Sequence, residues 1–226
     1  MNKKSNIKAP LGGALSLSKW VWGVFFLFSF SSLFAQSDRQ AERIIADFIN
    51  SVERNSVQAE FELTTLDSNN RPMQTQNGIF RMRGNKFSLL TDEFDVFFDG
   101  TTQWTYMDAV GEVMITEPTG DDLAEINPIF LLREHQNNST IRFAVGNAGA
   151  NYSIDLIPSA QADFSRIFVQ INRSTRNLVS VHLVSRQGFS MQVNFTQFQR
   201  GVNIPDSYFV FDINNYDNDI FINDLR

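Results

Sequence analysis

Histidine is the side chain best suited to acid–base catalysis and metal binding near neutral pH, and this chain of 226 residues contains two of them. His135 follows an apolar run, and His182 lies inside an alternating one. Neither is followed by a second metal-binding side chain at the spacing that a metal site requires. We therefore interpret both as structural residues and predict no metal site.

The other reactive residue types are equally uninformative. Glu60 and Glu62 share one face of an alternating run, where solvated acids are common. The tail has four aspartates, but it lacks the glycine and terminal glutamate of a calcium loop: Asp212, Asp217, Asp219 and Asp224. There is no cysteine, and neither a Gly-x-Ser-x-Gly motif nor a phosphate-binding loop is present. We predict no catalytic residue, no cofactor and no enzymatic activity.

Apolar side chains are the remaining signal. The chain has 22 phenylalanines, and 17 of them follow residue 35. A core accounts for many of these side chains. However, a strongly curved sheet also has a concave face that its own side chains do not always fill, and such interiors hold apolar ligands. This composition favours binding of an apolar ligand.

The N-terminus has the order of a secretory signal peptide. Lys3, Lys4, Lys8 and Lys19 precede an uncharged, mostly apolar run over residues 20–35, which ends in Ala35. We predict a cleavable signal peptide at residues 1–35 and one domain at residues 36–226. The alternative is an uncleaved N-terminal anchor.

Net charge argues against two classes of partner. Residues 36–226 contain 25 acidic and 15 basic side chains, a net charge of −10. Nucleic acids and anionic membrane surfaces attract clustered lysine and arginine. We therefore expect no nucleic-acid partner and no binding to an anionic membrane surface.

The periodicity predicts a helix followed by many strands. Residues 37–54 repeat apolar side chains at helical spacing, and residues 57–66 alternate as a half-buried strand does. Further short runs rich in aromatic and branched residues predict strands at 73–83, 86–91, 95–98, 103–107 and 112–116.

Residues 117–135 interrupt this pattern. Pro128 suits a first helical turn, and residues 129–132 are too apolar for a loop, so we predict one or two short helices over the sheet. Strands resume at 140–145, 152–157, 164–171, 178–184 and 189–198, with a last one near 208–213. The predicted fold is mainly β: an unclosed antiparallel β-barrel, or strongly curved sheet, covered by an N-terminal helix and short lid helices.

An ordered set of short motifs resembles a known family, the periplasmic outer-membrane lipoprotein carriers, LolA. The motifs are Gly78-x-Phe80, Met82-Arg83-Gly84-Asn85-Lys86-Phe87, Asp99-Gly100-x-x-x-Trp104-x-Tyr106, Asn127-Pro128-x-Phe130-Leu131-Leu132 and Leu156-x-Pro158. Their order and approximate spacing extend over most of the domain. One departure is Gly84, which stands where the family's Arg-Pro-x-x-Phe motif has proline.

The resemblance implies a monomeric periplasmic chaperone that moves acylated lipoproteins from the inner to the outer membrane. The implied partners are a LolCDE-like inner-membrane ABC-type exporter and an outer-membrane acceptor. Two alternatives stay open. One is a lipid-sensing module like that of periplasmic anti-sigma regulators such as RseB, and the other is a carrier of another lipid.

The resemblance and the strand pattern together give candidate site residues. The predicted lipid-binding residues are Phe61, Leu63, Phe80, Met82, Phe87, Leu89, Trp104 and Tyr106. The predicted lid residues are Ile129, Phe130, Leu131 and Leu132. The family's arginine, which bonds to the lid in the closed state, corresponds to Arg83, and Arg81 is a second candidate for that latch. Alternation alone leaves open which face of residues 79–83 points inward.

Overall fold

The computed structural model describes residues 21–216 and 219–226, and for residues 21–37 it describes the backbone only. Residues 1–20 of the predicted signal peptide therefore lie outside the described residues. The chain divides into two units, Met1–Gln36 and Ser37–Arg226, and the second unit contains the sheet. No helix in the described residues is long and apolar enough to cross a membrane.

Helix α1 (Val21–Arg54) provides the first layer of the second unit through its residues 37–54. Its apolar positions recur at helical spacing, and all of them are buried: Ala41, Ile44, Ile45, Phe48, Ile49 and Val52. These side chains belong to the same core cluster as the sheet. The predicted amphipathic helix is thus present.

The first half of the sheet is a meander. Its strands are β1 (Val57–Leu66), β2 (Pro72–Arg83), β3 (Lys86–Thr91), β4 (Phe94–Phe98), β5 (Gln103–Met107) and β6 (Glu112–Thr116), with a 3₁₀ turn, η1 (Asp108–Val110), before β6. Each pairs antiparallel with the next. Gly84 turns β2 into β3 at φ 60°, a left-handed conformation that favours glycine.

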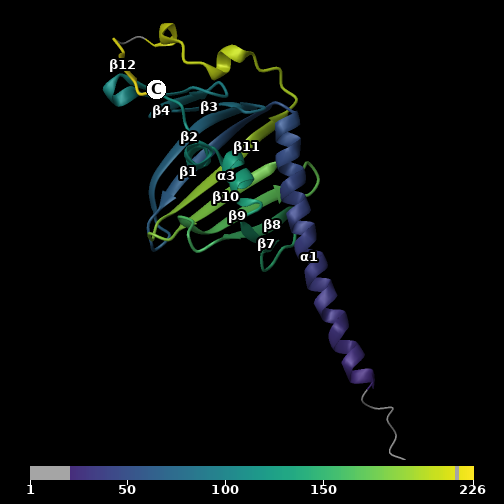
Figure 1. Ribbon diagram of the computed structural model, residues 1–226. Helices are drawn as coiled ribbons and strands as arrows, with labels where there is room; N and C mark the ends of the chain where they lie inside the picture. Colours follow the sequence, from purple (N-terminus) through teal and green to yellow (C-terminus); the bar gives the residue numbers. More distant parts are fainter. Residues whose placement is uncertain (1–20, 217–218) are drawn as a thin grey trace, which may run out of the picture. The chain divides into compact units, whose positions relative to one another are not determined.

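The second half is another meander, and it joins the first through β1. Its strands are β7 (Ser139–Phe143), β8 (Asn151–Pro158), β9 (Phe164–Asn172), β10 (Leu178–Ser185) and β11 (Ser190–Arg200). β11 pairs antiparallel with β1, which places Phe195 opposite Phe61. The described strands form one open sheet with β7 at one edge and β12 (Phe221–Asp224) at the other. Figure 1 shows its strong curvature. The predicted mainly-β, unclosed architecture is confirmed.

Two short helices fill the predicted interruption: α2 (Gly120–Ile126) and α3 (Pro128–His135). Their buried side chains join the core that α1 and the sheet form. Both helices therefore lie over the same sheet face as residues 37–54.

The C-terminal segment differs from the prediction. Residues 208–213 form no strand. Instead, two 3₁₀ turns, η2 (Asp206–Phe209) and η3 (Ile213–Asn215), precede β12 (Phe221–Asp224), which pairs parallel with β6. The physical reason is position. Residues 204–216 cross the face of the sheet opposite the helices, where Phe211 stacks on Tyr106. No strand edge is available for pairing there. The yellow end of the chain in Figure 1 runs past β3 and β4 to β12.

Candidate functional site

The two faces of the sheet are distinguished by alternation along each strand. On β4, Val96 and Phe98 join the core beneath the helices, whereas Phe97 stacks edge-on with Phe211 of the C-terminal segment. On β2, Phe80 and Met82 are 1% and 0% exposed and face the core. This settles the orientation that the sequence left open: Phe80 and Met82 point inward, and Arg81 and Arg83 point to the other face.

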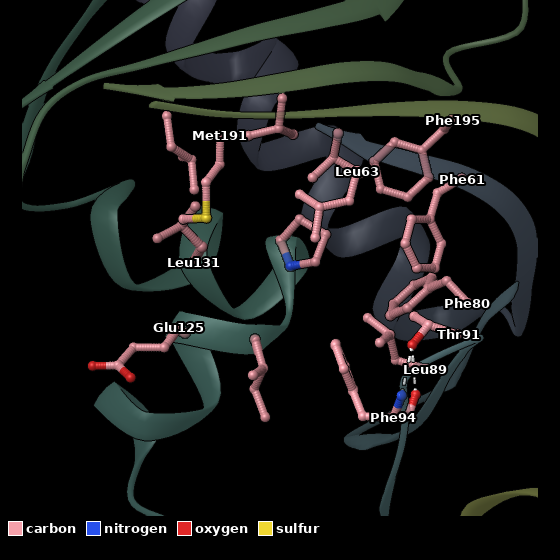
Figure 2. Close-up of a pocket in the computed structure, with 16 residues that line it drawn as sticks. Phe61, Leu63, Phe80, Leu89, Thr91, Phe94, Glu125, Leu131, Met191 and Phe195 are labelled. Atoms are coloured by element: carbon pink, nitrogen blue, oxygen red, sulfur yellow. Dashed lines mark hydrogen bonds between the residues drawn. The ribbon is translucent and has the colours of Figure 1, made fainter. Parts of the chain in front are cut away.

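A cavity of about 180 Å³ lies between the inner face of the sheet and the helices α2 and α3. Its walls come from β1–β4, β10 and β11, and its cover comes from residues 124–131. The lining residues are Phe61, Leu63, Phe80, Leu89, Thr91, Phe94, Ala124, Glu125, Ile126, Pro128, Leu131, Val181, Leu183, Met191, Val193 and Phe195. Figure 2 shows the phenylalanine rings of the sheet on one side and Leu131 with Met191 on the other.

The lining has only two polar members. Thr91 satisfies its hydroxyl locally, because Oγ1 donates to the carbonyl oxygen of Phe94 (2.7 Å) and accepts from the Phe94 amide (3.0 Å). The exposed Glu125 points its carboxylate away from the cavity in Figure 2. The interior thus offers hydrocarbon and aromatic surface without a charged group, which suits an apolar chain.

Local sequence explains why α2 and α3 form at this place. Thr119 begins α2 with a capping box, in which its amide and hydroxyl bond to the Asp122 carboxylate at 2.8 and 2.7 Å. Asn127 caps α3, and its side-chain oxygen accepts from the Ile129 amide at 2.9 Å. Pro128 occupies the first helical position, where its missing N–H costs nothing.

Helix α3 is attached to the sheet mainly by apolar contact. The ring of Phe130 lies 5.9 Å from that of Phe87 and 6.4 Å from that of Phe98. Arg133 adds polar attachment, since Nε lies 3.0 Å from Oε1 of Glu53 at the end of α1. Its guanidinium also lies 4.4 Å from the Phe130 ring centroid.

The structure brings half of the predicted lipid-binding residues to this cavity. Phe61, Leu63, Phe80 and Leu89 line it. Met82 and Phe87 share the inner face but lie in the packed core without lining the cavity. Among the predicted lid residues, Leu131 lines the cavity. The other three are buried in the core beside it: Ile129, Phe130 and Leu132.

Trp104 and Tyr106 are placed elsewhere, which corrects the expectation that they share this cavity. They alternate with Gln103 and Thr105 on β5 and point to the opposite face. Tyr106 is 2% exposed because Tyr216 covers it at a ring distance of 4.3 Å. Their aromatic character thus reflects the C-terminal cover and not the cavity.

Arg83 and Arg81 also contact a different partner from the one expected. Arg83 Nη1 donates to the carbonyl oxygen of Ile204 at 2.6 Å, and Nη2 pairs with Asp206. Hydrogen bonds from Lys86 and Arg83 lower the pKa of the Asp206 carboxyl. Arg81 lies 4.7 Å from the Tyr208 ring centroid. These arginines attach the C-terminal segment, because β2 directs both away from the lid, and the predicted latch to the lid helices is corrected.

Sequence reasoning missed the far wall of the cavity. Five lining residues come from β10 and β11: Val181, Leu183, Met191, Val193 and Phe195. Their alternation was visible in the sequence. The missing information was the pairing of β1 with β11, which brings residues about 130 positions apart in the chain side by side.

The two histidines lie apart from the cavity. His135 ends α3, and burial lowers its pKa. His182 alternates with the inward Val181 and Leu183 and so faces outward, where burial and Arg166 lower its pKa. Among the described residues no group of three His, Cys, Asp or Glu side chains is placed to hold a metal ion.

The chain is similar to several solved structures at low sequence identity. An uncharacterized conserved protein from Thermus thermophilus has a TM-score of 0.51 at 10% identity, over 80% of this chain and 96% of the other. A LolA superfamily protein from Nitrosomonas europaea has a TM-score of 0.37 at 11% identity, over 74% and 97%. The complex of MucA and MucB from Pseudomonas aeruginosa has a TM-score of 0.42 at 12% identity, over 76% and 61%. The likeness to the Thermus thermophilus protein concerns the fold alone, and the two likenesses with TM-scores below 0.5 carry no argument.

No curated protein matches the chain. In contrast, residues 31–188 match the family model described as outer membrane lipoprotein carrier protein LolA. The matched range contains both lid helices and the walls formed by β1–β4 and β10, and it ends before β11 and the C-terminal segment. The chain therefore belongs to the LolA family of outer membrane lipoprotein carrier proteins.

Proposed function

We propose that this protein is a periplasmic carrier that holds the acyl chains of lipoproteins beneath α2 and α3 while they cross from the inner to the outer membrane. The observation that carries the proposal is the lining of the cavity, in which every residue except Thr91 and Glu125 is apolar. Membership of the LolA family supports the same function.

The size of the cavity implies that the lid must move. Ligand sites usually measure about 300–1,000 Å³, and a cavity of about 150 Å³ takes a molecule such as benzene. A cavity of about 180 Å³ therefore accepts only part of one acyl chain. Leu131, which is 2% exposed, occupies space that a chain would need. We infer that the described conformation is the closed one and that acyl chains displace the helix pair.

The energetics favour such an exchange. Each CH₂ that leaves water gains about 0.8 kcal/mol, so a long acyl chain compensates for the lid contacts that it replaces. When the chain leaves, the apolar side chains of α3 return to the cavity. The carrier thus exchanges one apolar filling for another and does no covalent chemistry.

Delivery requires a donor and an acceptor at the two membranes. We propose an inner-membrane ABC-type exporter as the donor of acylated lipoproteins and an outer-membrane acceptor as the recipient. The net charge of −10 over residues 36–226 keeps the loaded carrier away from anionic headgroups between these encounters.

The test is to purify the protein from its native envelope and to identify bound species by mass spectrometry. We expect triacylated lipoproteins with the wild-type chain and their loss with Leu131→Asp. Recovery of free phospholipid alone would contradict lipoprotein carriage and favour a carrier of another lipid.

A further inference from the structure

Over β3–β6, the face of the sheet opposite the cavity is also mostly apolar. Asp95 and Phe97 on β4, and Trp104 and Tyr106 on β5, point to this second face by alternation. Leu90 on β3 and Ile115 on β6 extend it on both sides, and both are half-buried. A sheet with one wet face would place polar side chains here. The second face is therefore built to be covered.

Residues 204–216 supply only part of that cover. They are attached at one end by Arg83, which bonds to Ile204 and Asp206, and at the other by Tyr216, whose hydroxyl donates to Asp95 at 2.7 Å. Phe209 is fully buried between these attachments.

Between the attachments, segment and sheet do not touch everywhere. Phe211 packs on Phe97 and Tyr106, and beside these contacts an open cleft of about 1070 Å³ lies between segment and sheet. On the segment side its lining includes Tyr208, Val210 and Ile213, which are 45%, 39% and 43% exposed. On the sheet side it includes the half-buried Trp104. Apolar side chains on both sides of the cleft are exposed to water. Covering them gains about 25 cal/mol for each Å² of apolar surface removed from water, so an apolar occupant is favoured.

The charges of the cleft select among apolar occupants. The lining contains two carboxylates, Asp95 and Asp212, and in the described part of the chain it contains no lysine, arginine or histidine. Asp212 Oδ1 already accepts from the Asn214 amide at 3.0 Å. Asp95 is half-buried beside Tyr216, and no cation of the described residues shifts its pKa. Aromatic rings attract ammonium groups through their faces. An anionic headgroup would meet two carboxylates among the described lining residues, and the nearby cation, Arg81, already lies over the Tyr208 ring.

We propose that this cleft is a second binding site, separate from the acyl cavity, for an amphiphile with an apolar chain and an ammonium headgroup. The chain lies between Trp104 and the apolar side chains of residues 208–213, and the headgroup pairs with Asp95. The segment side of the site comes from residues 207–216 and Ile222, which lie beyond the matched part of the family model.

Trp104 supplies a reporter within the site. The chain has three tryptophans, and the other two are Trp20 and Trp22. In the full chain with Trp20→Phe and Trp22→Phe, we would titrate dodecyltrimethylammonium below its micelle concentration and follow the emission of Trp104. Dodecyl sulfate has the same chain with the opposite charge. We expect a saturable change with the ammonium amphiphile at a concentration at least about tenfold lower than with the sulfate.

Asp95→Asn tests the headgroup contact, because the amide oxygen still accepts from Tyr216 while the charge is lost. We expect it to weaken binding about tenfold. Asp92→Asn removes the same charge from a nearby exposed position outside the cleft, and it should leave the affinity unchanged. Equal affinities for the two amphiphiles, no saturable change, or equal effects of the two variants would each overturn the proposal.

Discussion

Arg133 of α3 and Glu53 of α1 form an ion pair, with 3.0 Å between Nε and Oε1. The side chains are 28% and 38% exposed, so the pair is partly screened by water. It is the polar counterpart of the apolar contacts that Phe130 and Leu131 make with the sheet. Under the proposed mechanism α1 stays packed while acyl chains displace α3, so the pair would stabilise the closed conformation.

Removal of this ion pair should make loading easier. Glu53→Gln eliminates the charge on the α1 side, and a partly exposed pair contributes about 0.5 kcal/mol. We expect the apparent affinity for a fluorescent triacylated peptide to rise about twofold, since less free energy is spent on opening. Glu42→Gln, an exposed position on the same helix, is the matched control. If both variants bind alike, Arg133 does not hold the lid.

An acid inside the cavity should prevent loading. Leu131→Asp places a carboxylate among apolar side chains, where neither an acyl chain nor the sheet can satisfy it. We expect acyl-peptide binding to fall at least about tenfold, while far-UV circular dichroism retains the strand signal. Val145→Asp makes a similar change at a fully exposed turn and should bind normally. Normal binding by Leu131→Asp would show that the chains lie elsewhere.

Gly78 leaves room for one wall of the cavity. A Cβ at this position would lie 2.5 Å from Cζ of Phe61 and 2.4 Å from the carbonyl oxygen of Leu90. Gly78→Ala should therefore push the Phe61 ring into the cavity and strain the pairing of β2 with β3. We expect a loss of about 1–3 kcal/mol of unfolding free energy, with weaker acyl binding.

The control for that variant is Gly120→Ala, because a Cβ there meets no atom within 4 Å and the backbone φ is ordinary. Urea unfolding of the two variants measures the difference. Equal midpoints would mean that the Phe61 ring can move aside without cost, and they would contradict the prediction.

The half-buried carboxyl of Asp95 should make the stability of the folded state depend on pH. Burial raises the pKa of its carboxyl above the ordinary value of 3.8, so the folded state binds the proton more tightly than the unfolded state does. This contribution to stability is present at low pH and is lost as pH rises through the folded pKa. Asp95→Asn should therefore raise the melting temperature at pH 7, and the gain should shrink as pH falls toward 4. A gain in melting temperature that does not change with pH would show that the ionisation of Asp95 is not its cause.

The sequence predicted which segments form helices and strands better than it predicted which face of the sheet each side chain lies on. The meander, the lid helices and the apolar face of residues 37–54 all follow from local periodicity and capping residues such as Thr119 and Asn127. The orientation of β4 and β5 does not follow, because aromatic residues occur on both faces: Phe98 is inward, and Phe97 and Trp104 are outward. Local patterning cannot distinguish a core from a face that a distant segment covers.

The C-terminal segment illustrates the same limit. Residues 208–213 have the composition of a strand, yet no edge is free where they lie, and they form an irregular stretch between two 3₁₀ turns. Arg83 likewise looked like a lid latch, and its partner proved to be Asp206, 123 positions away. Contacts at such separations depend on the assembled sheet and not on local sequence.

The most direct measurement of lipoprotein carriage is photocrosslinking from inside the cavity. A benzophenone analogue of phenylalanine would replace Phe94, which lines the cavity, or Phe189, which is 37% exposed in the turn before β11. After irradiation of intact cells, crosslinked species would be identified by mass spectrometry. The predicted result is acylated N-terminal lipoprotein peptides joined at position 94 and not at position 189. Equal yields at the two positions, or phospholipid as the sole product at position 94, would contradict carriage of lipoproteins in this cavity.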